Sequence, residues 1–151
     1  MIIMVEGKPP SVNHIYGFTW RHGQAVTYLL PEAKEYKKHV WAMAQNAVVN
    51  QKWIVPEIGR RVGVSFWFFW ADRKKRDTHN CLKLILDGLQ GVVYPDDQYV
   101  LPSVIDFQVD PENPRVEMVV RLPPLDQALS PMDLEAVANV ERKQAIERGA
   151  Y

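Results

Sequence analysis

The sequence lacks several features that would identify a protein class. It has one cysteine, Cys81, in 151 residues, which excludes an intrachain disulfide and a zinc site built from several thiolates. Its longest strongly apolar run, Val62 to Trp70, is far shorter than the ~20 residues of a membrane helix. Met1 to Gly7 contains no basic region and no small-residue cleavage site of a secretory signal. We therefore expect a cytoplasmic protein with no membrane association.

The chain also lacks net charge, since its 18 basic and 18 acidic side chains cancel. This argues against indiscriminate attraction of the whole surface to nucleic acid, so any basic binding region must be local. The composition, 47% hydrophobic and 24% charged, is that of a globular protein, without repeats or low-complexity segments. The length predicts one domain.

Hydrophobic periodicity predicts the secondary structure. Pro31 and Glu32 open a helix, because proline fits the first helical turn and an acid suits the positive end of the helix dipole. A turn at His22 and Gly23 between β-prone flanks indicates a hairpin over residues 19–30. The expected elements are helices at 31–50 and 78–90 and strands at 2–5, 61–70, 99–109 and 115–122. We predict an α+β fold, a single domain in which a mixed β-sheet packs with a few helices.

The predicted strands differ in which faces are apolar. Strand 61–70 is apolar on both faces, so it is either central or half covered by a partner subunit. Strand 99–109 places on one face the side chains of Tyr99, Leu101, Ile105, Phe107 and Val109. Strand 115–122 alternates with Val116, Met118, Val120 and Leu122 inward.

On helix 78–90 an apolar stripe of Leu82, Ile85, Leu86 and Leu89 lies opposite a polar one of Asn80, Lys83 and Asp87. Leu84 intrudes on the polar side, which a subunit contact would explain. The main domain then covers residues 1–122. Residues 123–151 form an extension after Pro123 and Pro124, and we expect it to be helical.

The candidate chemistry is concentrated between Asp72 and Asp97. Four consecutive cations, Arg73, Lys74, Lys75 and Arg76, are followed at once by potential metal ligands. Cleavage of a phosphodiester needs a divalent cation held by carboxylates and a cation for the developing charge. If residues 77–79 are extended, Asp77 and His79 point to the same side and can share one metal ion.

Each of these residues alone has an ordinary structural explanation. Asp77 can be a helix N-cap, and His79 a surface or capping side chain. Lys83 and Asp87 can be a surface ion pair, and Asp96 with Asp97 a turn. The basic run can be a solvated loop. Their combination in one short span favours a site.

These residues resemble the RusA-type Holliday junction resolvases, a family of small homodimeric endonucleases of bacteria and their prophages. One block of the resemblance is Pro9-Pro10-Ser11-Val12-Asn13 with Tyr16 beyond it. The other contains residues 72–77, then Asn80, Lys83, Asp87-Gly88-Leu89 and Asp96-Asp97 followed by Val100. The order and spacing also agree, so the resemblance covers about residues 3–122.

The resemblance implies a homodimer and Mg²⁺-dependent cutting of four-way DNA junctions in recombination and repair. It makes Asp77 and Asp97 metal ligands, Asp96 a neighbour in the same cluster, and Lys83 a group that assists at the scissile phosphate. Asn80 supports the site, and we add Asp87 as a second supporting residue. We expect Asn13 and the basic residues Arg73, Lys74, Lys75 and Arg76 to contact the DNA.

One residue departs from the family pattern Asp-x-Asp-Asn, because the chain has Asp77-Thr78-His79-Asn80. We include His79 as a metal ligand and catalytic residue, and because imidazole suits Mn²⁺ better than Mg²⁺, Mn²⁺ is a second candidate metal. Three alternatives remain open: the metal preference has shifted, Asp96 or Asp87 compensates, or catalysis is weakened. The competing functions are a junction-binding protein that does not cut and a structural adaptor dimer.

Overall fold

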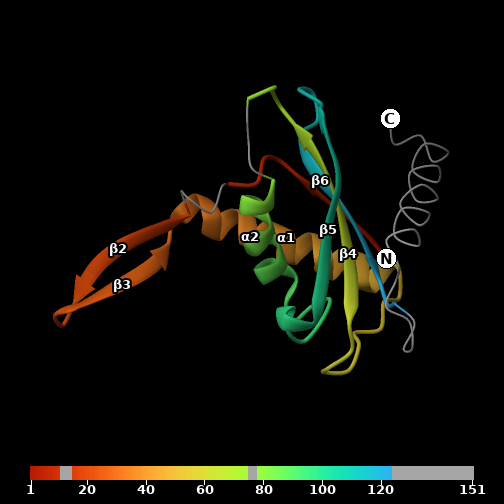
Figure 1. The fold of residues 1–151 in the computed structure, drawn as a ribbon, viewed down its shortest axis with the longest axis horizontal. Coiled ribbons are helices and arrows are strands. Elements are labelled where there is room, and N and C mark those ends of the chain that lie inside the picture. Colours follow the sequence, from red (N-terminus) through yellow and green to blue (C-terminus); the bar gives the residue numbers. More distant parts are fainter. Residues whose placement is uncertain (11–14, 75–77, 124–151) are drawn as a thin grey trace.

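The computed structural model describes residues 1–10, 15–74 and 78–123, with the backbone alone at Asn80. The described elements are, in chain order, β1 (Ile2–Glu6), β2 (Tyr16–Arg21), β3 (Gln24–Leu29), α1 (Pro31–Asn50), β4 (Val62–Trp70), α2 (His79–Leu89), the 3-10 helix η2 (Asp97–Tyr99), β5 (Val100–Val109) and β6 (Arg115–Arg121). Four strands form one sheet in the order β1-β6-β4-β5, and β2 pairs with β3 in a separate hairpin. The predicted α+β fold with a mixed sheet is confirmed (Figure 1).

The mixed character of the sheet comes from a single strand pair. β4 runs parallel to β5, whereas the β1–β6 and β4–β6 pairs are antiparallel. β4 is therefore flanked on both edges, and all nine of its residues are buried. This confirms a central position for the strand that is apolar on both faces, one of the two explanations given above.

Both helices lie against the same face of the sheet. The main core joins the α1 residues Tyr36, Val40 and Ala44 to alternate residues of β4, from Val62 to Trp70. α1 begins and ends as predicted, with Pro31 in its first turn and Glu32 next to it. In the described part of the chain, neither helix is long and apolar enough to cross a membrane.

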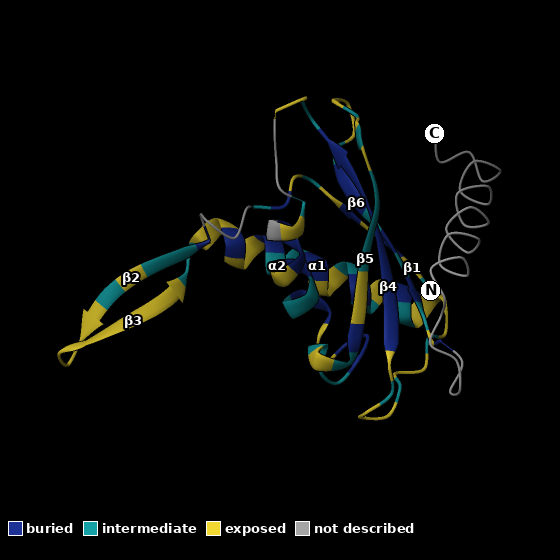
Figure 2. Ribbon diagram, viewed as in Figure 1, coloured by how far each residue is buried: buried dark blue, intermediate teal, exposed yellow. Residues whose placement is uncertain are grey.

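The hairpin turns at the predicted residues, but its first strand begins at Tyr16, three residues before the predicted start. His22 and Gly23 have positive φ angles of 48° and 77°, the conformation of a type I′ turn, whose twist matches that of the flanking strands. The pairing runs from Tyr16 opposite Leu29 to Arg21 opposite Gln24. Figure 2 shows that most of this hairpin is exposed, and it projects away from the sheet.

The prediction that the apolar residues of the fifth strand share one face is wrong. Leu101 pairs with Gly63, and Phe107 pairs with Phe68. Positions 63 and 68 belong to opposite faces of β4, so Leu101 and Phe107 lie on opposite faces as well. The cause is a bulge at Ile105, because Val104 and Asp106 pair with the consecutive residues Phe66 and Trp67. An extra residue in one strand inverts the alternation beyond it. Exposure agrees with an edge strand, since Leu101, Phe107 and Val109 are all exposed.

Two further expectations need correction. Leu84 is fully buried within its own chain, so no subunit contact is needed to explain it. The reason is that α2 packs on α1 as well as on the sheet and buries residues on more than one side. Leu122 was expected to point inward, but it lies just beyond β6 and is exposed. The other inward residues of that strand are buried as predicted.

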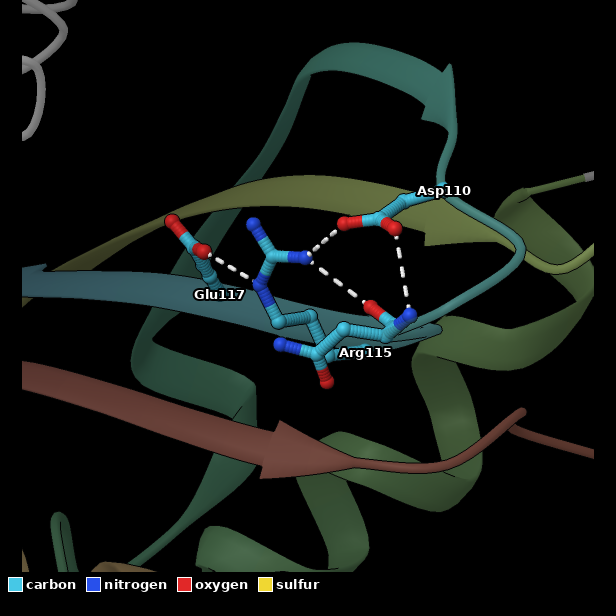
Figure 3. Close-up of polar contacts among 4 residues, drawn as sticks. Asp110, Arg115 and Glu117 are labelled. Atoms are coloured by element: carbon cyan, nitrogen blue, oxygen red, sulfur yellow. Dashed lines mark hydrogen bonds and ion pairs between the residues drawn. The ribbon is translucent and has the colours of Figure 1, made fainter. Parts of the chain in front are cut away.

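On the second face of the sheet, an arginine side chain lies over Phe69. The Arg115 guanidinium carbon lies 3.7 Å from the centroid of the Phe69 ring. It donates to Glu117 Oε1 and to Asp110 Oδ2, each at 2.6 Å, and to the Asn113 carbonyl at 2.9 Å (Figure 3). Phe69 is consequently 4% exposed although no described helix lies over it.

Candidate active site

The candidate site residues lie on the connection between β4 and β5. Parallel strands cannot be joined by a tight turn and need a crossover, usually one that contains a helix. Here the crossover contains α2 and η2, and it carries every predicted site residue except Asn13. Asn13, Lys75, Arg76 and Asp77 lie outside the described residues.

Three of the predicted residues share one stripe of α2. His79, Lys83 and Asp87 are spaced four residues apart, so they follow one another along the same side of the helix. Lys83 Nζ lies 3.6 Å from Asp87 Oδ1. The lysine is largely exposed while the aspartate is 22% exposed, so the pair presents its cation outward.

Tyr94 connects this pair to Asp97. Its ring is fully buried, and its hydroxyl donates to the Leu86 carbonyl at 3.0 Å. Burial raises the pKa of this hydroxyl far above its ordinary value, and the carboxylates of Asp97 and Asp87 raise it further. Both carboxylates are therefore near the same phenol. The structure thus brings Lys83, Asp87 and Asp97 into one neighbourhood.

The segment between α2 and η2 is held by backbone hydrogen bonds. The Leu89 carbonyl accepts from the Val93 amide at 2.9 Å, and Gly91 N donates to the Tyr94 carbonyl at 2.8 Å. Gly91 has a φ of 78°, which glycine adopts without strain. The indole of Trp53 donates to the Val93 carbonyl at 3.0 Å. These bonds fix where the chain re-enters the sheet and hence where Asp97 lies.

Asp96 has a structural role in this segment. It is the N-cap of η2, and its two carboxylate oxygens accept from the amide and the side chain of Gln98 at 3.0 and 2.9 Å. A short polar side chain at this position satisfies amides that the helix leaves unpaired. The predicted membership of Asp96 in the metal cluster stays a prediction.

The basic and N-terminal parts of the site are described only in part. Arg73 and Lys74 are exposed, and the Lys74 amide donates to Asp72 Oδ1 at 2.9 Å, which orders the start of the basic segment. His79 is exposed in the first turn of α2. At ~1.5 Å rise per residue it lies ~12 Å along the helix from Asp87. His79 therefore lies at the opposite end of this helix stripe from Asp87.

The donors in this neighbourhood suit a hard divalent cation. Asp87 and Asp97 supply carboxylate oxygens near one hydroxyl, the ligand type that Mg²⁺ and Mn²⁺ prefer. Within residues 1–10, 15–74 and 78–123, no three histidine, cysteine, aspartate or glutamate side chains come together as a metal-binding group. A complete ligand set would require Asp77, which is not among these residues.

Two residues contribute to the site that the sequence did not indicate. Tyr94 has no sequence signal for this role, because its contact with Leu86, eight residues back along the chain, follows no periodic pattern. Gly88 permits the close packing of α2 on α1, because a Cβ there would lie 2.8 Å from Val40 Cγ1. Its place in the segment Asp87-Gly88-Leu89 was the signal that could have identified it.

Comparison with known families decides the classification. The family of endodeoxyribonuclease RusA matches residues 6–121 of the chain. The chain belongs to this family. The match confirms the resemblance, and it takes in both helices and the whole crossover with Lys83, Asp87 and Asp97. RusA family membership supports an endonuclease acting on DNA. No curated protein matched the chain significantly.

Proposed function

We propose that this protein is a metal-dependent endonuclease that cleaves four-way DNA junctions during recombination and repair in the cytoplasm. The observation that carries the proposal is the grouping of Asp87 and Asp97 near one buried phenol, with Lys83 paired to the first of them. The residue types match the chemistry, since phosphodiester hydrolysis needs carboxylates for a metal and a cation for the phosphate. The RusA family match supports the same reaction.

We assign the metal to Asp77 and Asp97, with a third ligand that is either His79, at the family's usual aspartate position, or an acid that takes its place. When bound, Mg²⁺ or Mn²⁺ supplies a Lewis acid at the phosphate and a water of lowered pKa. Of the two acids that could compensate for His79 in the usual aspartate position, we favour Asp87. It affects the same hydroxyl as Asp97, whereas both oxygens of Asp96 already accept hydrogen bonds from a neighbouring glutamine.

Lys83 offsets the negative charge that develops on the scissile phosphate. Its ammonium is exposed, and Asp87 at 3.6 Å keeps it on the stripe that leads to His79. Asn80 supports the site. Arg73, Lys74, Lys75 and Arg76, with Asn13, bind backbone phosphates, a sequence-independent interaction that weakens with salt.

We further propose that the active form is a homodimer. A four-way junction presents two equivalent strands, and a protein with two-fold symmetry can nick both of them. One chain supplies one set of candidate groups, so paired incisions require two copies.

The test is cleavage of a labelled four-way junction in Mg²⁺ and in Mn²⁺. Wild type should nick the junction, and Asp97→Asn should lose the activity while it retains binding. Glu57→Gln is the matched control, because Glu57 is an exposed carboxylate outside the crossover. If wild type binds the junction but leaves it intact in both metals, the endonuclease proposal is wrong.

The substitution at His79 favours one second candidate, a family member that binds junctions without cutting them. In that case a gel shift persists in chelator, and His79→Asp restores cleavage in Mg²⁺. The two compensating acids are separated by Asp87→Asn and Asp96→Asn. We expect the first to reduce cleavage more than the second, and the reverse order would exclude Asp87 as the compensating acid.

A further inference from the structure

The β2–β3 hairpin carries two of the most exposed large aromatic side chains of the described chain. Phe18 is 77% exposed and Trp20 is 75% exposed. Such rings carry ~150–250 Å² of surface each, and exposed apolar surface of this size on a soluble protein marks a contact site more often than a random feature. In Figure 1 the hairpin extends well away from the sheet and the helices.

The root of the hairpin is fixed to the body of the protein. Ile15 is fully buried, and its carbonyl accepts from the Leu30 amide at 2.7 Å, just before α1 begins. Tyr16 and Leu29, the first pair of the ladder, pack against the main core. The hairpin is thus anchored at one end, and its six-residue strands reach ~20 Å from that root.

The two rings lie on one face of the hairpin, opposite small residues of β3. Phe18 and Trp20 are two residues apart on β2, so they point to the same side. Their partners on β3 are small, Thr27 opposite Phe18 and Ala25 opposite Trp20. Of the two other aromatics of the hairpin, Tyr16 shares this side but packs against the main core at the root, and Tyr28 lies on the other side. The ring faces on the first side are therefore left open to a ligand.

The spacing of the two rings fits a nucleobase. Two residues of a strand span about 6.7 Å, and bases stacked in DNA are about 3.4 Å apart, so a base between two rings needs about 6.8 Å. The same two-residue spacing on β4 places stacked ring centroids 6.2 Å apart for Phe66 and Phe68 and 5.3 Å apart for Phe68 and Trp70, so the two rings must open slightly to admit a base. A strand of this chain can therefore hold two parallel rings at nearly the required distance.

The charge of the hairpin also favours nucleic acid. Between Tyr16 and Leu30 the sequence contains Arg21 and His22 at the tip and no acidic residue. A cation beside exposed aromatic rings is the combination that proteins use for unpaired strands. The root shares its core with the first turn of α2, because Ile15 and Cys81 belong to one cluster of buried residues. Figure 1 shows the hairpin extending from the α2 side of the molecule.

We propose that Phe18 and Trp20 take up an unstacked base where the strands of the DNA separate at the branch point. This inference rests on the proposed function, and it assigns recognition of branched rather than continuous DNA to the hairpin. A linear duplex offers no free base faces away from its ends. A junction offers them at its centre, where stacking is interrupted.

The experiment measures binding of a labelled four-way junction and of a linear duplex in chelator, so that no cutting occurs. The double variant Phe18→Ala/Trp20→Ala should bind the junction between about 5-fold and about 150-fold more weakly, the range for loss of base stacking. Its affinity for the duplex should stay unchanged. Trp41→Ala is the control, because Trp41 is an exposed aromatic on α1 and should have no effect.

A second variant keeps the inference testable if alanine weakens the hairpin itself. Phe18→Leu/Trp20→Leu retains apolar bulk but has no aromatic face, and it should lose junction affinity as the alanine variant does. The aromatic exchange Phe18→Trp should preserve it.

Three results would overturn the inference. One is unchanged junction binding by both double variants while wild type binds and cuts, which leaves the proposed function intact. Another is an equal loss on junction and duplex. The third is a lower mass, by light scattering, for the free alanine double variant than for free wild type. That result would mean that the rings contact a second copy. Failure of wild type to bind any junction would overturn the proposed function as well.

Discussion

Arg115 should stabilise the fold more than any surface ion pair of this chain. Its side chain is 6% exposed and contacts two carboxylates, Asp110 at 33% and Glu117 at 17% exposed. Its guanidinium also lies over the ring of Phe69. Arg115→Met retains most of the apolar stem and removes the charge, so it isolates the polar contribution. It leaves two carboxylates partly buried without their cation.

The expected loss follows from these contacts. Removing one partner of a fully buried ion pair costs ~3–5 kcal/mol, because the other charge stays unpaired. Here water reaches both carboxylates and reduces that cost, while loss of the cation–π contact adds ~0.5–2 kcal/mol. We expect the free energy of unfolding to fall by about 3 kcal/mol for Arg115→Met. The melting temperature should fall by roughly 10 °C.

Urea denaturation followed by tryptophan fluorescence at neutral pH measures this loss. Arg115→Lys should lie between wild type and Arg115→Met, because an ammonium cannot form the same fork or stack as a guanidinium does. Adding Glu117→Gln to Arg115→Met should recover about 1 kcal/mol by removing one unpaired charge. Arg21→Met is the control, since Arg21 is exposed at the hairpin tip. A loss below about 1 kcal/mol for Arg115→Met would refute the reasoning.

Three further predictions concern the site and the pH response. Tyr94→Phe removes one hydrogen bond to the Leu86 carbonyl, which should cost about 1 kcal/mol in urea denaturation; a loss above about 3 kcal/mol would contradict this. Gly88→Ala places a Cβ 2.8 Å from Val40 Cγ1, so α2 must shift and the melting temperature should drop. An unchanged melting temperature would show that α1 and α2 are not tightly packed. Hydrogen bonding to the guanidinium described above lowers the pKa of Asp110. Its contribution is present above the unfolded pKa near ~3.9 and is lost as pH falls through the lower folded value, so wild type should lose stability on acidification more steeply than Asp110→Asn.

The fold was predictable where local signals agree. α1 has a proline in its first turn and apolar residues at helical spacing, and the structure gives the predicted bounds. The hairpin turn was predictable because Gly23, which adopts a positive φ angle without strain, lies between β-prone flanks. The bulge at Ile105 was not, because nothing in the strand itself marks where its partner's register shifts.

The site was predictable by residue type and less so by arrangement. Lys83 and Asp87 form the pair that their spacing allows. The position of Asp97 near Asp87 depends on how the chain turns after α2. The buried phenol of Tyr94 and the indole hydrogen bond of Trp53 determine that turn. These are tertiary contacts without a periodic signal. The predicted partnership of Asp77 and His79 falls on residues that are only partly described and stays a prediction.

The parallel β4–β5 pair restricts how this protein can be altered. All candidate groups of the crossover are carried by one continuous stretch whose ends are fixed by the pairing of Val62 with Val100 and of Trp70 with Val109. One residue added between Lys83 and Asp87 would rotate everything beyond it by ~100° and turn Asp87 away from Lys83. The exposed turn at residues 111–113 lies outside this stretch, so length variation there would disturb the Asn113–Arg115 hydrogen bond but leave the candidate groups where they are.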